Sequence, residues 1–141
     1  MKISDIKIKS FLTYADRWDQ GHALPKPDTE LMQTVLTIET DEGISGHFIG
    51  GGTHGDQEGL NNVDQNLILG RIRDLLIGQN PLDREMIWQW LLVAWFPENV
   101  ASVIDNALWD LAGRMTNLPV YKLIGGARDK VKAYASTYPN I

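Results

Sequence analysis

The sequence of 141 residues contains no cysteine, so the chain can form neither a disulfide nor a thiolate metal site. No apolar run approaches the roughly 20 residues that span a bilayer, and the N-terminus lacks the apolar segment of a secretory signal. The 13 basic residues are scattered among 18 acidic ones, which disfavours nucleic acid as a partner. With 43% hydrophobic and 22% charged residues, the composition is globular, and we expect a cytoplasmic protein without a membrane partner.

The N-terminal part of the chain is expected to form β-strands. Apolar residues alternate with lysines over residues 3–12, and β-branched residues dominate residues 32–40. Residues 44–49 alternate again, and the intervening Asp41-Glu42-Gly43 predicts a hairpin turn with a positive φ angle at the glycine. The long connection 16–28 contains two prolines and a glycine, and connections of that length in compact domains commonly carry function or are mobile.

Helices are expected in the second half of the chain. The apolar spacing over residues 63–77 predicts a helix that Gly78 can end, and Asn80 then predicts the cap of a next helix with Pro81 at its first position. The clearest helix covers residues 100–115. Its apolar positions follow the i, i+3, i+4 rule without a break: Val100, Val103, Ile104, Ala107, Leu108, Leu111, Ala112 and Met115.

The chain after this helix is expected to end in a strand. Asn117 and Pro119 should stop the helix, and a short turn should follow over residues 119–124. Residues 130–136 then alternate like a strand, which needs a neighbouring strand. That partner could be the N-terminal sheet or a sheet of which this is the first strand.

The run Gly50-Gly51-Gly52-Thr53-His54-Gly55 fits the dinucleotide-binding pattern in letters only. A dinucleotide loop requires a parallel strand–helix–strand unit and a helix that begins at the glycines. Here the preceding strand belongs to an antiparallel hairpin, and the acidic Asp56 and Glu58 follow at once. We therefore expect a flexible connecting loop after the hairpin.

Three histidines, His22, His47 and His54, raise the question of a zinc site. No pair has helical spacing and no cysteine could assist, so we expect no metal site among them. His47 fits the outer face of a strand, whereas His22 and His54 lie in glycine-containing loops suited to contacting a polar ligand. Trp18 also lies in a loop, whereas Trp88, Trp95 and Trp109 have the spacing of packing residues in a core or an interface.

The sequence shows no assembled catalytic machinery. No serine lies in a G-x-S-x-G turn, and no Ser/His/Asp order is persuasive. Asp105 and Asp110 are five residues apart on one helix, so their side chains point about 140° away from one another. Structural ion pairing is the expected role of these carboxylates, including an i, i+4 pair of Asp110 with Arg114.

Several segments together carry a resemblance to a known family. They are ASVIDNALWDLAG at 101–113, LPVYKLIGG at 118–126, VKAYAS at 131–136, TDEGISGH at 40–47, and LIGQNP at 76–81 ahead of Ile87-Trp88. The chain resembles the N-terminal part of the mandelate racemase/muconate lactonizing enzyme branch of the enolase superfamily.

The resemblance implies an α+β capping domain, in which a three-stranded antiparallel sheet and a helical bundle pack over a modified (β/α) barrel. Residues 1–126 would form the cap, and residues 127–141 would begin the barrel with its first strand. In this family the barrel supplies the acid/base residues and the carboxylates that hold Mg²⁺, and the reaction removes the proton α to a carboxylate. No catalytic or metal residue can therefore be assigned in this chain, and residues 1–141 alone are expected to be inactive.

The resemblance also implies that two cap loops reach the substrate pocket, here residues 16–28 and 50–59. Their candidate substrate-binding residues are Trp18, His22, Lys26, Thr53 and His54. This polar and cationic set suits an acid sugar, so we expect a parent enzyme that dehydrates one and assembles as a homo-oligomer. A racemase or cycloisomerase of the same branch is the alternative, as is a stand-alone, non-catalytic binding or assembly module.

Overall fold

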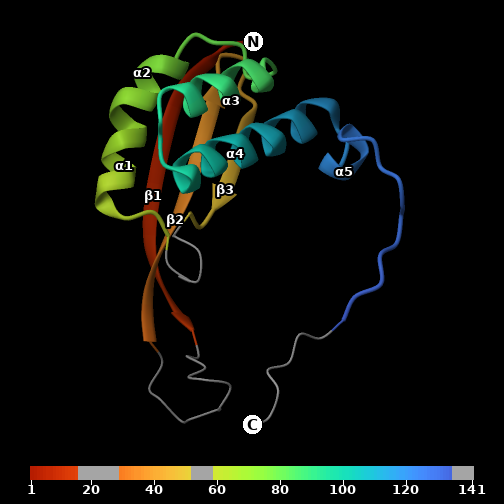
Figure 1. The fold of residues 1–141 in the computed structure, drawn as a ribbon, viewed down its shortest axis with the longest axis horizontal. Coiled ribbons are helices and arrows are strands. Elements are labelled where there is room, and N and C mark those ends of the chain that lie inside the picture. Colours follow the sequence, from red (N-terminus) through yellow and green to blue (C-terminus); the bar gives the residue numbers. More distant parts are fainter. Residues whose placement is uncertain (16–28, 52–58, 135–141) are drawn as a thin grey trace.

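The computed structural model describes residues 1–15, 29–51 and 59–134. A three-stranded antiparallel sheet with the order β1-β2-β3 is followed by a layer of helices (Figure 1). The α+β architecture predicted from the sequence is thereby confirmed. Its elements are β1 (Ile3–Ala15), β2 (Thr29–Thr40), β3 (Ser45–Ile49), α1 (Asn62–Leu67), the π-helical turn η1 (Ile68–Ile72), α2 (Arg73–Leu76), α3 (Arg84–Val93), α4 (Glu98–Thr116) and α5 (Val120–Leu123).

The three predicted strands are all present, and β1 and β2 are longer than predicted. Their ladder continues in register to the pair Ala15↔Thr29, so both strands reach the edges of segment 16–28. At the other end of β2, Gly43 has a φ of 79°, which confirms the predicted hairpin turn. The Thr40 hydroxyl donates to the carbonyl of Ile44 at 2.7 Å and ties the turn closed.

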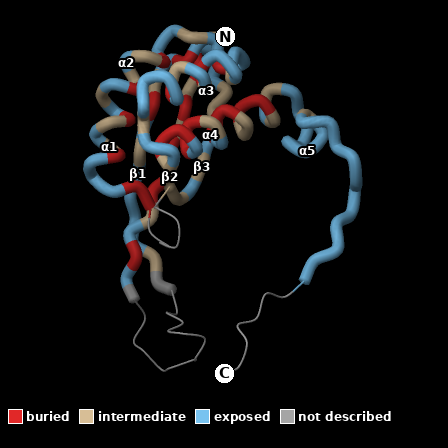
Figure 2. The backbone as a smooth tube through the Cα atoms, viewed as in Figure 1, coloured by how far each residue is buried: buried red, intermediate tan, exposed pale blue. Residues whose placement is uncertain are grey.

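Helix α4 forms the centre of the core. It packs across one face of the sheet against β2 and β3, and its buried side meets the buried parts of the strands (Figure 2). Of the eight apolar positions predicted on this helix, only Met115 is half-buried and the other seven are buried. The rest of the core comes from the sheet and the other helices: Ile3, Ile6, Leu36, Ile38, Leu60, Ile68, Ile72, Leu76, Ile87 and Leu91.

The helix predicted over residues 63–77 is confirmed, and the helix that follows it needs correction. The chain is helical without a break from Asn62 to Leu76, with the π-helical turn η1 between α1 and α2, and Gly78 has a φ of 82° just after its end. Helix α3 begins at Arg84 and not at Pro81. The reason is local, because the Asn80 side chain accepts a hydrogen bond from the backbone N–H of Leu82 at 3.1 Å and stabilises a turn that competes with the helix.

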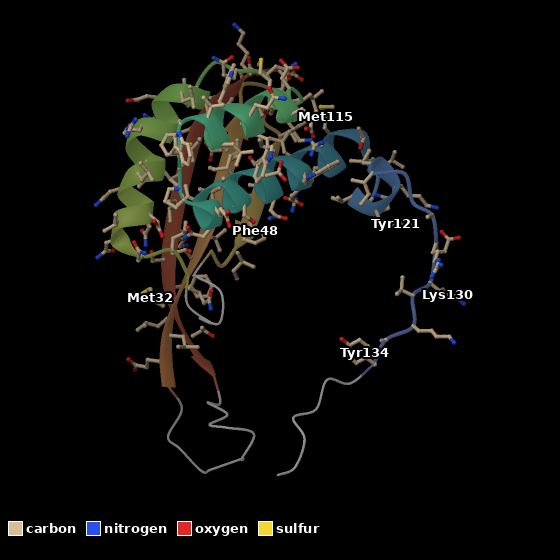
Figure 3. All side chains as sticks on the ribbon, viewed as in Figure 1. Met32, Phe48, Met115, Tyr121, Lys130 and Tyr134 are labelled. Atoms are coloured by element: carbon tan, nitrogen blue, oxygen red, sulfur yellow. The ribbon has the colours of Figure 1, made fainter. Side chains whose placement is uncertain are left out.

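Beyond α4 the prediction is partly right. Asn117 adopts the left-handed conformation with a φ of 52° and ends α4 as predicted, and the expected turn over 119–124 contains the short helix α5. The strand predicted over 130–136 is not formed in residues 130–134, and its last two residues lie outside the described part. Figure 3 shows Lys130 and Tyr134 on an extended tail apart from the sheet, and none of the strands in the described residues pairs with it.

The tryptophans predicted to pack do so unequally. Trp88 is half-buried against the core, and the half-buried Trp109 ring carries the Arg84 guanidinium 3.1 Å from its centroid. Trp95 is 90% exposed and has a φ of 56°, so it is not a core residue. Its position follows the C-terminal end of α3, where the helical period that suggested packing no longer applies.

Candidate functional site

The sheet topology brings the ends of two segments to one end of the molecule. Strands β1 and β3 are both antiparallel to β2, so their C-terminal ends lie at the same end of the sheet (Figure 1). Segment 16–28 begins after β1, and segment 52–58 begins just after β3. All five candidate residues, Trp18, His22, Lys26, Thr53 and His54, fall in these two segments and lie outside the described residues.

Apolar side chains are exposed on the strands at this end. Leu12 and Met32 are cross-strand partners on the face that the helices cover farther up the sheet, and Phe11 and Ile49 lie on the opposite face. Figure 3 shows Met32 on the part of the sheet that extends below the helical layer. The two segments therefore start from strands that present apolar surface, a feature typical of a binding or interdomain face.

Thr34 joins both ends of segment 52–58 to β2. Its side chain is fully buried, and its hydroxyl donates to the carbonyl of Gly50 at 2.8 Å and accepts from the N–H of Leu60 at 2.8 Å. The N–H of Gly50 donates to the Thr34 carbonyl at 2.9 Å, and that of Gly59 donates to the Met32 carbonyl at 2.7 Å. The start and the end of the segment are consequently fixed side by side, and Gly51 and Gly59 form an antiparallel bridge.

The two carboxylates predicted to form ion pairs on α4, Asp105 and Asp110, lie in different surroundings. Asp110 Oδ2 accepts from Arg114 Nε at 2.8 Å, which confirms the predicted ion pair, and also from the backbone N–H of His47 at 2.8 Å. Asp105 is half-buried, and burial raises the pKa of its carboxyl against the opposing effect of nearby Arg84. The predicted ion pair is thus present at Asp110, whereas for Asp105 the structure shows a nearby Arg84 charge and a half-buried position.

His47 lies on the outer face of β3, as the alternation predicts. Its side chain is exposed, and its Nδ1 lies 3.0 Å from the hydroxyl of Thr37 on the neighbouring strand. Farther along this face, the Asp5 carboxylate accepts from Arg73 Nε at 3.0 Å, and this hydrogen bond lowers the pKa of Asp5. These contacts join β2 to β3 and tie β1 to α2.

Within residues 1–15, 29–51 and 59–134, no three His, Asp or Glu side chains are grouped so that they could hold a metal ion. The same ranges contain no helix that is long and apolar enough to cross a bilayer. Two shallow hollows of about 360 and 410 Å³ lie elsewhere, one along α3 and the other at the C-terminal end of α4.

Comparison with known proteins shows the family to which the chain belongs. Residues 28–125 match the family described as the N-terminal domain of mandelate racemase/muconate lactonizing enzyme. The chain is 40% identical over 107 residues to a D-galactonate dehydratase of Pectobacterium atrosepticum, in a match that covers 71% of the chain and 26% of that protein. The chain thus spans about a quarter of the length of this relative.

Solved structures show the same fold. The D-glucarate dehydratase from Agrobacterium tumefaciens complexed with magnesium superposes with a TM-score of 0.76 at 37% identity, over 95% of this chain and 35% of that one. An enolase superfamily member from Polaromonas sp. JS666 superposes with a TM-score of 0.71 at 28% identity, over 96% and 36%. In both cases the chain corresponds to about a third of the solved protein.

Proposed function

Since the chain belongs to the mandelate racemase/muconate lactonizing enzyme family, with its N-terminal domain over residues 28–125, we propose that the parent protein is an acid-sugar dehydratase. The observation that carries the proposal is 37–40% identity to two proteins named for dehydration of acid sugars, D-galactonate and D-glucarate. This favours dehydration over racemisation, cycloisomerisation or a purely non-catalytic binding role.

Dehydration of an acid sugar removes the proton α to the carboxylate and expels the hydroxyl of the next carbon as water. The enol that remains becomes a 2-keto-3-deoxy acid. The described residues offer no ligand set for Mg²⁺, so no step of this chemistry is assigned to them. We propose that residues 1–126 act as the cap, that residues 127–141 begin the catalytic barrel, and that the barrel would hold the metal.

We propose that the cap, residues 1–126, contributes to substrate recognition. Segments 16–28 and 52–58 begin at the same end of the sheet, and the ends of the second are held together by Thr34. Their candidate residues can donate hydrogen bonds to sugar hydroxyls or, in the case of Lys26, offset the charge of a carboxylate. The substrate-binding residues of the proposal are Trp18, His22, Lys26, Thr53 and His54.

The proposed reaction is tested with the full-length parent protein, Mg²⁺ and a panel of acid sugars that includes D-galactonate and D-glucarate. We expect formation of a 2-keto-3-deoxy acid from at least one of them, detected as its semicarbazone. Conversion of none of them would contradict the proposed function. Inversion of a stereocentre without loss of water would instead indicate a racemase or epimerase.

We predict that His22→Ala or His54→Ala lowers kcat/KM of the parent for its acid sugar. A hydrogen bond to substrate is worth about 0.5–1.5 kcal/mol between neutral groups and about 1.5–3 when one group is charged. These energies correspond to losses of roughly 2- to 150-fold in kcat/KM, at 1.4 kcal/mol per tenfold. Steady-state kinetics measures the loss, while the affinity for Mg²⁺ should stay unchanged.

The third histidine supplies the matched control. His47 is exposed on the outer face of β3 and contacts Thr37, so His47→Ala should leave kcat/KM unchanged. If both loop variants keep the wild-type kcat/KM on a substrate that the parent uses, neither His22 nor His54 belongs to the site.

A further inference from the structure

Trp95 has a strained backbone conformation at the end of α3. The N–H groups of Trp95 and Phe96 donate to the carbonyls of Leu92 and Leu91 at 3.0 and 3.2 Å, which is the hydrogen-bond pattern of a Schellman cap. This cap needs one left-handed residue, here Trp95 with a φ of 56°. Glycine is the usual residue at that position, because an L side chain is strained there. The helix end alone therefore does not explain a tryptophan.

The side chain of Trp95 makes little contact with its own domain. It is 90% exposed, whereas the next residue, Phe96, is half-buried and packs against the core. Phe96 thus supplies the hydrophobic contact that accompanies such a cap. A strained residue that the local fold does not need points to a function, and tryptophan is among the commonest anchors of protein interfaces.

An apolar hollow lies beside Trp95, between α2 and α3. This α2–α3 hollow has a volume of about 360 Å³ and is lined by Leu75, Gln89, Trp90, Val93 and Ala94. Because Ala94 is the direct neighbour of Trp95, a protruding ring and a hollow lie side by side on one surface. A cavity of about 150 Å³ holds a benzene ring, so the α2–α3 hollow has room for an indole.

We propose that a second copy of this chain covers this surface, with the Trp95 ring of each copy seated in the α2–α3 hollow of the other. A two-fold axis closes such an arrangement, because the same patch then supplies a ring and a hollow on both copies. Four of the five lining residues of the hollow are apolar, so the ring is buried there without removing a charge from water.

The charges at the rim of the hollow suit a second copy. Arg71 and Asp74 are both exposed on the side of η1 and α2, and the Arg71 guanidinium lies 5.5 Å from the centroid of the Phe96 ring. Since the rim carries charges of both signs, two copies related by a two-fold axis can set each charge against its opposite. A patch of one sign would instead repel itself.

The area of Trp95 is large enough to matter for a dimer. An aromatic side chain buries about 150–250 Å², and a tryptophan that is 90% exposed can contribute about 200 Å². A standard interface buries about 800 Å² on each partner, so this one ring supplies about a quarter of it. Val93, 77% exposed, and Leu92, 47% exposed, add apolar area next to it.

The proposed barrel begins on another side of the domain. Trp95 lies three residues before the first residue of α4, whereas residues 127–141 follow the C-terminal end of that helix. The 19 residues of α4 span about 28 Å at 1.5 Å per residue, and Figure 1 shows α5 at the far end of α4 from its connection to α3. A second copy therefore fits this surface better than the barrel. The inference does not depend on the proposed reaction.

The test measures the assembly of the full-length parent by sedimentation velocity at several protein concentrations. Trp95→Gly removes the ring and suits the φ of 56°, so the fold should be kept. Val93→Glu places a carboxylate at the hollow, and seating an indole there would remove that charge from water. Val63→Ala is the matched control, because Val63 is a 75% exposed apolar residue in α1 and does not line the hollow. Circular dichroism checks that all three variants are folded.

Trp95→Gly and Val93→Glu are each expected to raise the dissociation constant of the assembly at least about 30-fold, the effect of losing one interface hot spot. Val63→Ala should leave it unchanged. An equimolar mixture of Trp95→Gly and Val93→Glu should associate again, because a mixed pair retains one intact ring facing one intact hollow. This recovery separates seating of the ring from a structural role, since two damaged folds would not rescue one another.

Three results would overturn the inference. A wild-type parent that stays monomeric at every concentration has no such interface. Wild-type assembly of Trp95→Gly would show that the ring lies outside any contact between copies, including the case in which the barrel covers it. Loss of assembly in both variants without recovery in their mixture would exclude the reciprocal seating of ring and hollow.

Discussion

The Leu108→Ala variant is expected to have a free energy of unfolding about 2–5 kcal/mol lower than that of the wild type. Leu108 is 1% exposed and lies in the middle of α4, on the face that packs against the sheet. Alanine removes the buried apolar atoms and leaves a cavity that a rigid helix on a sheet cannot close. Urea denaturation followed by tryptophan fluorescence measures the difference.

Leu92→Ala is the matched control for this prediction. Leu92 is also helical, in α3, but its side chain is 47% exposed. Its replacement leaves no internal cavity, so the loss should stay below about 1 kcal/mol, within the range of ordinary surface substitutions. Coinciding unfolding curves for wild type and Leu108→Ala would mean that α4 does not face the sheet as described.

The sequence sufficed for the elements that bury a regular apolar pattern. Helix α4 shows why, because its eight apolar positions repeat with the helical period over more than four turns and therefore lie on one face, where seven of them are buried. The hairpin of β2 and β3 was equally predictable, since Gly43 and the alternating residues around it indicate the same structure. In both cases the local pattern and the tertiary contacts agree.

The sequence was less informative where tertiary contacts or neighbouring strands decide the structure. The alternation over 130–136 indicates a strand, but a strand needs a hydrogen-bonding neighbour, and residues 130–134 have none in the described structure. Trp95 fits a helical spacing, yet the helix ends at Val93 and leaves it exposed. The spacing of apolar residues indicates which side chains a helix or strand would bury. It does not show at which residue that helix or strand ends.

The candidate site, too, could be predicted from the sequence only in part. The sequence indicates the loops 16–28 and 50–59, because their length and glycine content interrupt the regular patterns. It gives no sign that Thr34 holds the ends of the second loop, since Thr34 lies well before Gly50 and Leu60 in the chain and only the fold brings the three residues together.

Gly46 carries the second large expected effect. Gly46→Ala should lower the free energy of unfolding by about 3 kcal/mol, at the upper end of the usual cost of overpacking. A methyl group at this position would collide with the carbonyl oxygen of Ala107 and lie 2.6 Å from Leu111 Cβ. Both obstacles belong to the rigid core helix α4, so β3 and α4 would have to move apart.

A glycine in open space separates this steric effect from the general effect of adding a methyl group. At Gly70, in the π-helical turn η1, an added Cβ would have no neighbour within 4 Å, and φ is not positive. Gly70→Ala should therefore stabilise the protein by about 0.5–1 kcal/mol, because alanine loses less backbone entropy on folding. Urea denaturation should thus shift the two midpoints in opposite directions. A Gly46→Ala midpoint at or above that of the wild type would contradict the close packing of β3 on α4, since only a wider spacing leaves room for the methyl group.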